Sequence, residues 1–380
     1  MALTRVKSAG VTSGGITANQ LNIGQIGGRR NVIINGGFTV SQRNAAALTA
    51  TTNNTYFLDR WRLYLNGSCA VSTQQMLSLD TNVTALNTAS GETFNNVLSI
   101  DCTTAASLGS TDLLGIIQMI EGYNTVPLAG QVCTLSFHVK TNVTGQYYVA
   151  LKMSGSSERT YLAPYTVSSA NTWEKKTITF TMDTATNLNN TASVTTGSGL
   201  QVYFGMRLGT SGQMSNTLNA WHAGNYYGKS DQVTWGTNTS DTFYLGGIQL
   251  EKGSLATPFE HRSFGEELSL CQRYYQAIPK YTFFNGAVEV SSNSLRAGVP
   301  ITRPLRASPT IGNITLIVYD DDDTSFSNAA HAVFANSEVP AIDGTTGFLS
   351  IVFNGNLSGR TDNHNVTALY GTKGTLDAEL

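Results

Sequence analysis

The amino-acid sequence predicts an all-β protein with more than one domain, and three observations support this prediction. Short apolar runs, some of them strictly alternating, recur along the chain and are separated by turns rich in Gly, Asn and Thr. No helical periodicity is found between these runs in the first two thirds of the chain. The 380 residues also exceed the roughly 250 to 300 at which a single core usually stops growing, so we expect two domains and an N-terminal arm.

Residues 1–30 are predicted to form an extended attachment arm. They carry +4 and no acid, which leaves −6 on the remainder of a chain whose net charge is −2. Their apolar residues recur every five positions, a spacing that suits neither a helix nor a strand and that chance could also produce. Such a segment cannot bury its apolar side chains alone, so we expect it to lie on sister chains or on another protein. The residues assigned to attachment are Arg5, Val6, Lys7, Val11, Ile16, Leu21 and Ile26.

Residues 31–262 are predicted to form an antiparallel jelly-roll β-sandwich. The clearest strand is 131–140, where apolar and polar residues alternate, so that one face belongs to the core and the other faces polar groups. The run 113–121 is apolar on both faces, as expected of a central strand buried between layers. Further strands are expected at 96–102, 146–153, 173–181 and 200–208.

Asp59 and Arg60 stand directly before Trp61 in the segment YFLDRWRLYL. An acid next to a base invites a catalytic interpretation. We interpret the pair instead as a structural ion pair that covers an aromatic ring at the start of a strand. Trp173 is likewise expected in the core.

The stretch 242–262, TFYLGGIQLEKGSLATPFEHR, is predicted to be the closing strand of this domain, with a flexible Gly246-Gly247 pair and an exit through Gly253 and Pro258. A long polar insertion, 209–241, precedes it. Aromatic rings on such a loop suit a carbohydrate, because sugar C–H faces stack on rings while amides and hydroxyls bind the sugar hydroxyl groups. The candidate carbohydrate-binding residues are Trp221, His222, Tyr226, Tyr227 and Trp235, with Trp221 alternatively a packing anchor under the loop.

Residues 263–280 are predicted to form a short helical linker, because Ser263 and Glu266 have the spacing of a capping box and Pro279 ends the pattern. Residues 281–380 are predicted to form a second, smaller C-terminal β-sandwich. Its strands are expected at 282–290, 294–302, 311–319, 332–335, 348–353, 366–370 and 375–380.

No metal, cofactor or catalytic motif is assigned. The carboxylates of Asp320 and Asp322 are the remaining metal candidates, but an EF-hand loop starting at Asp320 would need Gly and Glu where Ser325 and His331 stand. The hydrolase, metalloprotease and P-loop signatures are absent from the sequence, so we expect a protein that is not an enzyme. Its cysteines lack metal-ligand spacing and are expected to be buried free thiols.

The charge and hydropathy of the chain narrow its partners. A net charge of −2 argues against a nucleic-acid binder that relies on neutralising phosphates. No stretch approaches the roughly 20 apolar residues of a membrane span, so we expect synthesis in a cytoplasm and no membrane insertion. Charged residues make up only 13% of the chain, which favours a surface of neutral hydrogen-bonding groups. Such a surface is common in β-sandwiches and in proteins that bind sugars.

Several motifs resemble one family. The order GGIQLEKG, then ATPFE, resembles the closing strand of the sandwich domains in bacteriophage tail fibres and related virion receptor-binding proteins, whose domain is like a carbohydrate-binding module. INGGF, followed by QR and then DRW, resembles the opening of the same domain, and EELSLCQRYYQ resembles the segment after it. Related jelly rolls carry a structural calcium ion, but Thr39 and the Gly246-Gly247 pair depart from the residues that bind it.

This resemblance implies a bacteriophage tail fibre that binds a host-surface polysaccharide without chemistry. It further implies a homotrimer, anchored to tail or baseplate proteins through residues 1–30 and located in the virion after synthesis in the cytoplasm of the host bacterium. One alternative is a purely structural virion component, such as a head fibre, collar or baseplate piece. A second alternative is a polysaccharide depolymerase.

Overall fold

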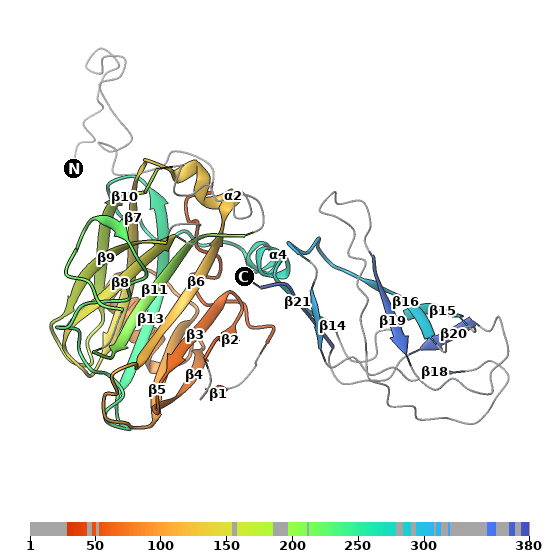
Figure 1. Cartoon of the computed structure of the whole chain (residues 1–380), viewed down its shortest axis with the longest axis horizontal. Helices are drawn as coiled ribbons and strands as arrows, with labels where there is room; N and C mark the ends of the chain where they lie inside the picture. The colour runs from red at the N-terminus through yellow and green to blue at the C-terminus, as the bar shows by residue number, and fades with distance from the viewer. Residues whose placement is uncertain are drawn as a thin grey trace, which may run out of the picture. The chain divides into compact units, whose positions relative to one another are not determined.

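The computed structural model of the protein describes residues 29–43, 48–50, 53–153, 158–184, 197–210, 213–278, 284–289, 294–307, 309–312, 318–319, 348–354, 365–368 and 374–379. The chain divides into two units, Met1–Ser263 and Phe264–Leu380. Antiparallel strands dominate both, which confirms the prediction of an all-β protein (Figure 1). Asp320, Asp322 and the predicted attachment residues of the arm lie outside the described residues.

The first unit is a β-sandwich of two antiparallel sheets. We call its six-stranded sheet, with the order β1-β4-β5-β13-β7-β10, sheet A. The closing strand β13 therefore lies inside sheet A, between β5 and β7. The strands of sheet A are β1 (Leu48–Ala50), β4 (Ala70–Met76), β5 (Val97–Thr104), β13 (Thr242–Lys252), β7 (Val132–Thr141) and β10 (Glu174–Thr181).

The seven-stranded sheet, with the order β12-β9-β8-β11-β6-β3-β2, is called sheet B. Its strand β9 has no counterpart among the predicted strands. It contains Pro164, and a proline within an apolar run argues against a central strand. The predicted strands at 113–121, 146–153 and 200–208 correspond to β6, β8 and β11. The strands of sheet B are β12 (Trp221–Ala223), β9 (Arg159–Val167), β8 (Gly145–Met153), β11 (Ser198–Leu208), β6 (Leu113–Glu121), β3 (Trp61–Asn66) and β2 (Thr55–Leu58).

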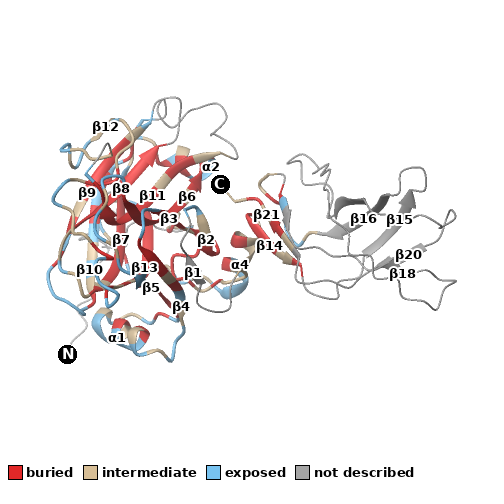
Figure 2. Ribbon diagram, turned by 60° about the horizontal axis from the view of Figure 1, so that its bottom comes forward, coloured by how far each residue is buried: buried red, intermediate tan, exposed pale blue. Residues whose placement is uncertain are grey.

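The core lies between the two sheets, where red buried strands face each other in Figure 2. The inward face of β7 carries Phe137, whose ring centroid lies 5.0 Å from that of Phe204 on β11 and 5.2 Å from that of Tyr165 on β9. Trp61 is fully buried against Phe38. The alternation predicted for β7 therefore does place its apolar residues in the core, as expected.

The prediction that the sandwich contains no helix is wrong, because helix α1 (Thr81–Ser90) follows β4. The Asp80 side chain caps it by accepting a hydrogen bond from the Asn82 backbone N–H at 2.7 Å, and Gly91 ends it at a φ of 71°. Only Val83 and Leu86 of this helix are buried, so its apolar stripe is too sparse to recognise as a period. A short helix α2 (Gly122–Thr125) and a 3₁₀ turn (Val126–Leu128) follow β6.

The Gly246-Gly247 pair is a site of close packing and not the flexible point predicted. The pair sits within the continuous strand β13, where the register against β7 shifts as at a β-bulge. A Cβ atom at Gly246 would lie 2.6 Å from Leu86 of α1, and one at Gly247 would lie 2.5 Å from Phe94. Gly247 also has a φ of +56°, which glycine adopts without strain.

The opening segment of the sandwich is bonded to its closing strand. The Asn31 side chain accepts a hydrogen bond from the Leu250 N–H and donates one to the Ile248 carbonyl, each at 3.0 Å. The Glu260 carboxylate accepts hydrogen bonds from the backbone N–H groups of Arg30 and Asn31, each at 2.9 Å. The opening segment and the closing strand therefore form one hydrogen-bonded unit.

Asp59 and Arg60 have structural partners. The Asp59 carboxylate accepts hydrogen bonds from the backbone and the side-chain amide of Gln42, each at 2.6 Å. The Arg60 guanidinium donates to the Met119 carbonyl. The Trp61 indole donates to the Asn35 carbonyl at 2.9 Å. These contacts hold the start of β3 against the opening segment and against β6.

The outer face of β7 is buried and carries His138, whose pKa is changed by this burial. His138 is 4% exposed and its ring centroid lies 5.5 Å from that of Phe94. Burial, followed by the nearby Lys175 ammonium, lowers the pKa of His138 to about 4 from the 6.5 of a free histidine.

We expect the His138→Leu variant to lose less stability in acid than the wild type. The unfolded chain takes up the proton near pH 6.5 and the folded chain only near pH 4, so the stability of the neutral form is present above pH 6.5 and falls with the pH. The wild type should lose about 3 kcal/mol from this group between pH 7 and pH 4. Urea unfolding at both pH values measures the difference, and equal losses in the two proteins would contradict the assignment.

The second unit begins with α4 (Phe264–Gln272), which is shorter than the predicted linker because the chain enters strand β14 (Tyr275–Ile278) before Pro279. Its sheets have the orders β14-β21-β17 and β18-β20-β15-β16-β19. The predicted strand at 332–335 lies outside the described residues. The remaining strands are β15 (Phe284–Glu289), β16 (Ser294–Pro300), β17 (Thr310–Gly312), β18 (Val318–Tyr319), β19 (Phe348–Asn354), β20 (Asn365–Ala368) and β21 (Gly374–Asp377).

Two further observations concern the whole described chain. The four cysteines are buried free thiols, as predicted. None of the helices within the described ranges has the length and apolarity needed to span a membrane.

Candidate functional site

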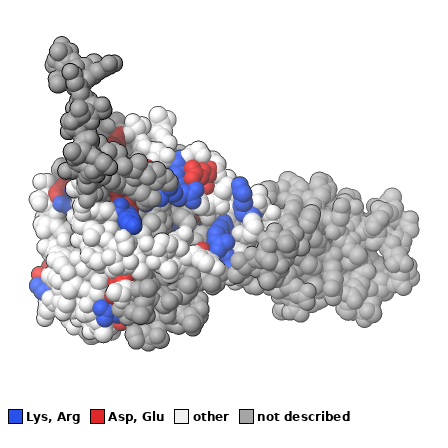
Figure 3. Space-filling view, turned by 90° about the horizontal axis from the view of Figure 1, so that it is seen from above, with Lys and Arg blue, Asp and Glu red and all other residues white. Residues whose placement is uncertain are grey.

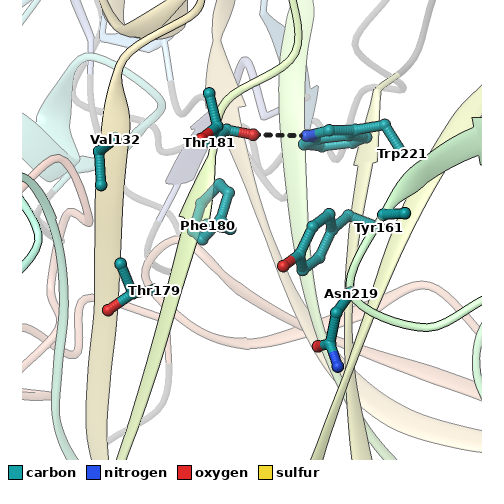
Figure 4. A pocket seen from close by; sticks show the side chains of 8 residues that line it. Val132, Tyr161, Thr179, Phe180, Thr181, Asn219 and Trp221 are labelled. Atoms are coloured by element: carbon teal, nitrogen blue, oxygen red, sulfur yellow. Dashed lines mark hydrogen bonds between the residues drawn. The ribbon is translucent and has the colours of Figure 1, made fainter.

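A pocket of about 380 Å³ lies in the first unit, where an edge of sheet A meets an edge of sheet B (Figure 4). The edge strand β10 supplies one wall, and β9 with β12 supplies the other. The pocket therefore joins residues that are far apart in the sequence. Its lining residues are Val132, Tyr161, Thr179, Phe180, Thr181, Asn219, Ala220 and Trp221.

Three aromatic rings form the apolar part of the pocket. The ring centroid of Trp221 lies 5.6 Å from that of Tyr161, which lies 5.5 Å from that of Phe180. Tyr161 and Phe180 are buried, whereas Trp221 is only half-buried. The Trp221 indole N–H donates to the Thr181 carbonyl at 2.8 Å, as Figure 4 shows. This bond fixes the indole across the gap between the sheets and leaves part of the ring open.

Backbone pairing and one ion pair hold Trp221 in place. In β12, Trp221 pairs with Tyr161 of β9. Before it, Asn219 adopts a φ of 55° and its N–H donates to the Leu162 carbonyl at 2.8 Å. The Arg159 guanidinium binds the Asp183 carboxylate and also donates to the Trp221 carbonyl at 3.3 Å. The ring is thus positioned by contacts on both sides of the pocket.

The polar groups of the pocket are neutral. The Thr179 hydroxyl lies 3.2 Å from that of Thr134 and 3.4 Å from the Ser254 carbonyl. The exposed side-chain amide of Asn219 makes no hydrogen bond to another described residue. An amide has both N–H donors and a carbonyl acceptor, so it can donate a hydrogen bond to a sugar hydroxyl or accept one from it.

Of the five candidate residues from the sequence, only Trp221 lines this pocket. His222 follows it on β12 and therefore points to the opposite side of the strand. There its ring stacks on that of Tyr226 at 4.9 Å, and both residues are half-buried. His222 and Tyr226 thus form a separate pair on the outer face of sheet B.

Tyr227 and Trp235 were expected on an exposed loop but are buried, at 4% and 0% exposure. The Tyr227 ring stacks on Tyr64 at 5.3 Å, and its hydroxyl accepts a hydrogen bond from the Lys152 ammonium at 2.6 Å. Trp235 belongs to the core between the sheets. The physical reason is that part of the insertion folds back onto an apolar area of sheet B, which also explains why β6 is apolar on both faces. The buried residues of sheet B that cluster with Tyr227 in this area are Leu113, Ile117, Ala150, Leu162, Tyr203 and Leu208.

Tyr161, Phe180 and Asn219 line the pocket but were not among the candidate residues from the sequence. One signal could have shown Tyr161: it alternates with Ala163, Tyr165 and Val167 as on a half-buried strand. No local sequence pattern indicates that these three residues lie beside Trp221 in the folded protein. In the described part of the chain no group of three or more His, Cys, Asp or Glu side chains could hold a metal ion.

Comparison with known proteins gives a fold likeness only. No family model matches the sequence, and no curated protein matches it. The family 11 carbohydrate-binding module of Clostridium thermocellum, solved with a β-1,3-1,4-mixed-linked tetrasaccharide, is 12% identical with a TM-score of 0.27, over 56% of this chain and 100% of that one. The enzymatically active domain of tailspike protein 4 from bacteriophage CBA120 is 11% identical with a TM-score of 0.29, over 59% of this chain and 21% of that one.

A third similar structure holds the carbohydrate-binding and catalytic modules of C. thermocellum xylanase 10B, with 10% identity and a TM-score of 0.29, over 57% of this chain and 30% of that one. TM-scores this low carry no assignment of function. The strands and their pairing define the class of protein directly: an antiparallel β-sandwich of jelly-roll type. Its candidate site is an aromatic pocket at the edge of the sandwich.

Proposed function

We propose that this protein binds a glycan in the pocket between the sheet edges and performs no chemistry on it. The observation that carries the proposal is the half-buried Trp221 ring, fixed beside Tyr161 in a pocket of about 380 Å³ whose polar side chains are hydroxyls and an amide. Sugar C–H faces stack on such a ring, and sugar hydroxyls bind groups such as the Asn219 amide.

The pocket favours binding over hydrolysis. Glycoside hydrolysis ordinarily uses a pair of carboxyl groups that flank the scissile bond. The eight residues that line the pocket include no Asp or Glu. The nearby carboxylate of Asp183 is bound to Arg159.

We propose further that the glycan belongs to a bacterial surface and that the protein is a bacteriophage tail fibre. Support comes from the sequence motifs at both ends of the sandwich, which are bonded to each other where the Ile248 N–H donates to the Gly36 carbonyl. On this proposal the fibre is a homotrimer, anchored to tail or baseplate proteins by residues 1–30. Weak single sites suffice in a trimer, because the first contact makes the next ones intramolecular.

We expect the Trp221→Ala variant to bind the glycan at least about tenfold more weakly, a loss of about 1.4 kcal/mol or more. The reason is that, of the three rings that line the pocket, the variant loses the one that is not buried. His222→Ala is the matched control, because His222 lies next in β12 but on the opposite side, and it should bind as the wild type does. Glycan-array binding and staining of host cells by the labelled full chain measure the effect.

Three results would contradict parts of this proposal. Equal glycan binding by the wild type and Trp221→Ala would show that this pocket is not where the glycan binds. A wild type that stains no host cells, together with particles that adsorb normally without it, would favour a purely structural virion component. Release of reducing ends from host polysaccharide would show a depolymerase.

A further inference from the structure

Resting on the proposed glycan binding, we infer that the pocket selects neutral sugars and excludes acidic ones. The inference concerns the chemical class of the ligand, which follows from the charges around the pocket. The pocket contains no Asp, Glu, Lys, Arg or His among its eight lining residues. Tyr161 is the one lining side chain that titrates, and burial raises the pKa of its hydroxyl, so it stays neutral at pH 7.

The charged pair beside the pocket is already compensated. Arg159 and Asp183 bind each other, and Arg159 also donates to the Trp221 carbonyl. A hexuronate carboxylate or a sugar phosphate entering the pocket would lose its water and gain no cation in return. Burying a charge without a partner is costly, whereas burying a hydroxyl that is hydrogen-bonded is not.

The groups that the pocket offers match a neutral sugar. The Trp221 N–H is bonded to the Thr181 carbonyl, so the indole presents its ring and not a donor. Val132, which is 42% exposed, adds an apolar wall. The Asn219 amide and the exposed Thr181 side chain supply neutral hydrogen bonds (Figure 4). On the face shown in Figure 3 the described surface is mostly neutral, with Lys, Arg, Asp and Glu side chains gathered in a few groups.

The first test compares matched ligands on the full-length protein. Neutral oligosaccharides of hexoses and N-acetylhexosamines are set against the same chains carrying one hexuronate or one phosphate. We expect binding of the neutral ligand to be at least tenfold tighter. We also expect the affinity of the neutral ligand to stay constant between about 0.05 and 0.5 M salt, since charge pairing alone would be screened.

The second test adds the missing cation. Thr181→Lys places an ammonium at the pocket and keeps the backbone carbonyl that holds Trp221. We expect this variant to bind the acidic ligands about tenfold more tightly than the wild type does. Thr177→Lys is the matched control, because Thr177 is also an exposed threonine of β10 and does not line the pocket.

The outcomes separate this inference from the proposed function. Acidic ligands that bind the wild type as tightly as neutral ones, with binding lost in Trp221→Ala, would overturn the neutral selectivity and keep the glycan function. Equal gains from Thr181→Lys and Thr177→Lys would also overturn it. A wild type that binds neither class would overturn the proposed function and the inference together.

Discussion

Replacing Arg207 by Met is expected to lower the free energy of unfolding of the first unit by about 3 to 5 kcal/mol, the cost of breaking a buried ion pair from one side. Arg207 is 1% exposed, and its Nε and Nη2 atoms donate to the Asp112 carboxylate at 2.9 and 2.7 Å. The same guanidinium donates to the carbonyls of Ala106 at 3.0 Å and of Trp235 at 3.2 Å. Without it, the buried Asp112 carboxyl group loses its cationic partner, and these carbonyls lose a donor.

Urea unfolding at pH 7 measures this effect, and two controls define its cause. Lys229→Met removes a cation from the more exposed pair with Asp231 and should cost about 1 kcal/mol or less. The double variant Arg207→Met, Asp112→Asn removes both charges and should recover part of the loss. If Arg207→Met costs no more than Lys229→Met, the pair does not stabilise the sandwich.

Replacing Gly36 by Ala is expected to disrupt the contact between the opening segment and the closing strand. A Cβ atom there would lie 2.1 Å from the carbonyl oxygen of Ile248, a backbone atom of β13. The two segments cannot separate freely, because the Ile248 N–H donates to the Gly36 carbonyl at 2.9 Å. We expect a loss of about 3 kcal/mol or more, at or above the usual range for overpacking.

Gly37→Ala is the matched control for this prediction. A Cβ atom at Gly37 would lie 3.3 Å from the ring of Phe259, a side chain that can shift by a few tenths of an ångström. We expect a cost of about 1 kcal/mol, near the low end for overpacking. Thermal unfolding of both variants measures the difference. Similar midpoints would show that the contact at Gly36 yields more easily than its backbone pairing suggests.

Several strands could be predicted because their physical signal is local. Strand β6 is apolar at nearly every position and β7 alternates, and each pattern indicates a strand with an apolar face in the core. Helix α1 was missed because only Val83 and Leu86 of its ten residues are buried. Its local signals were the cap Asp80 and the glycine Gly91, which mark the ends of a helix but do not establish one between them.

The candidate site was only partly predictable. Trp221 was among the candidates. Its partner Tyr161 lies on β9, which pairs with β12, whereas Phe180 lies on β10 of the other sheet, so strand pairing and the packing of the two sheets together assemble the three rings. Tyr227 and Trp235 were placed wrongly because the composition of the 209–241 insertion is that of a loop. The pattern of a loop does not tell which of its aromatic rings turn inward.

The sequence alone determined the fold class of this protein and the positions of several of its strands. Those features depend on neighbours along the chain and on alternation, which a sequence displays directly. Tertiary structure decided that the Gly246-Gly247 pair is a tight packing point and that the insertion covers sheet B. It also decided that Trp221 stands at a pocket between sheet edges. These outcomes depend on which surfaces meet in space, and burial of apolar area selects those surfaces over distances that no local pattern spans.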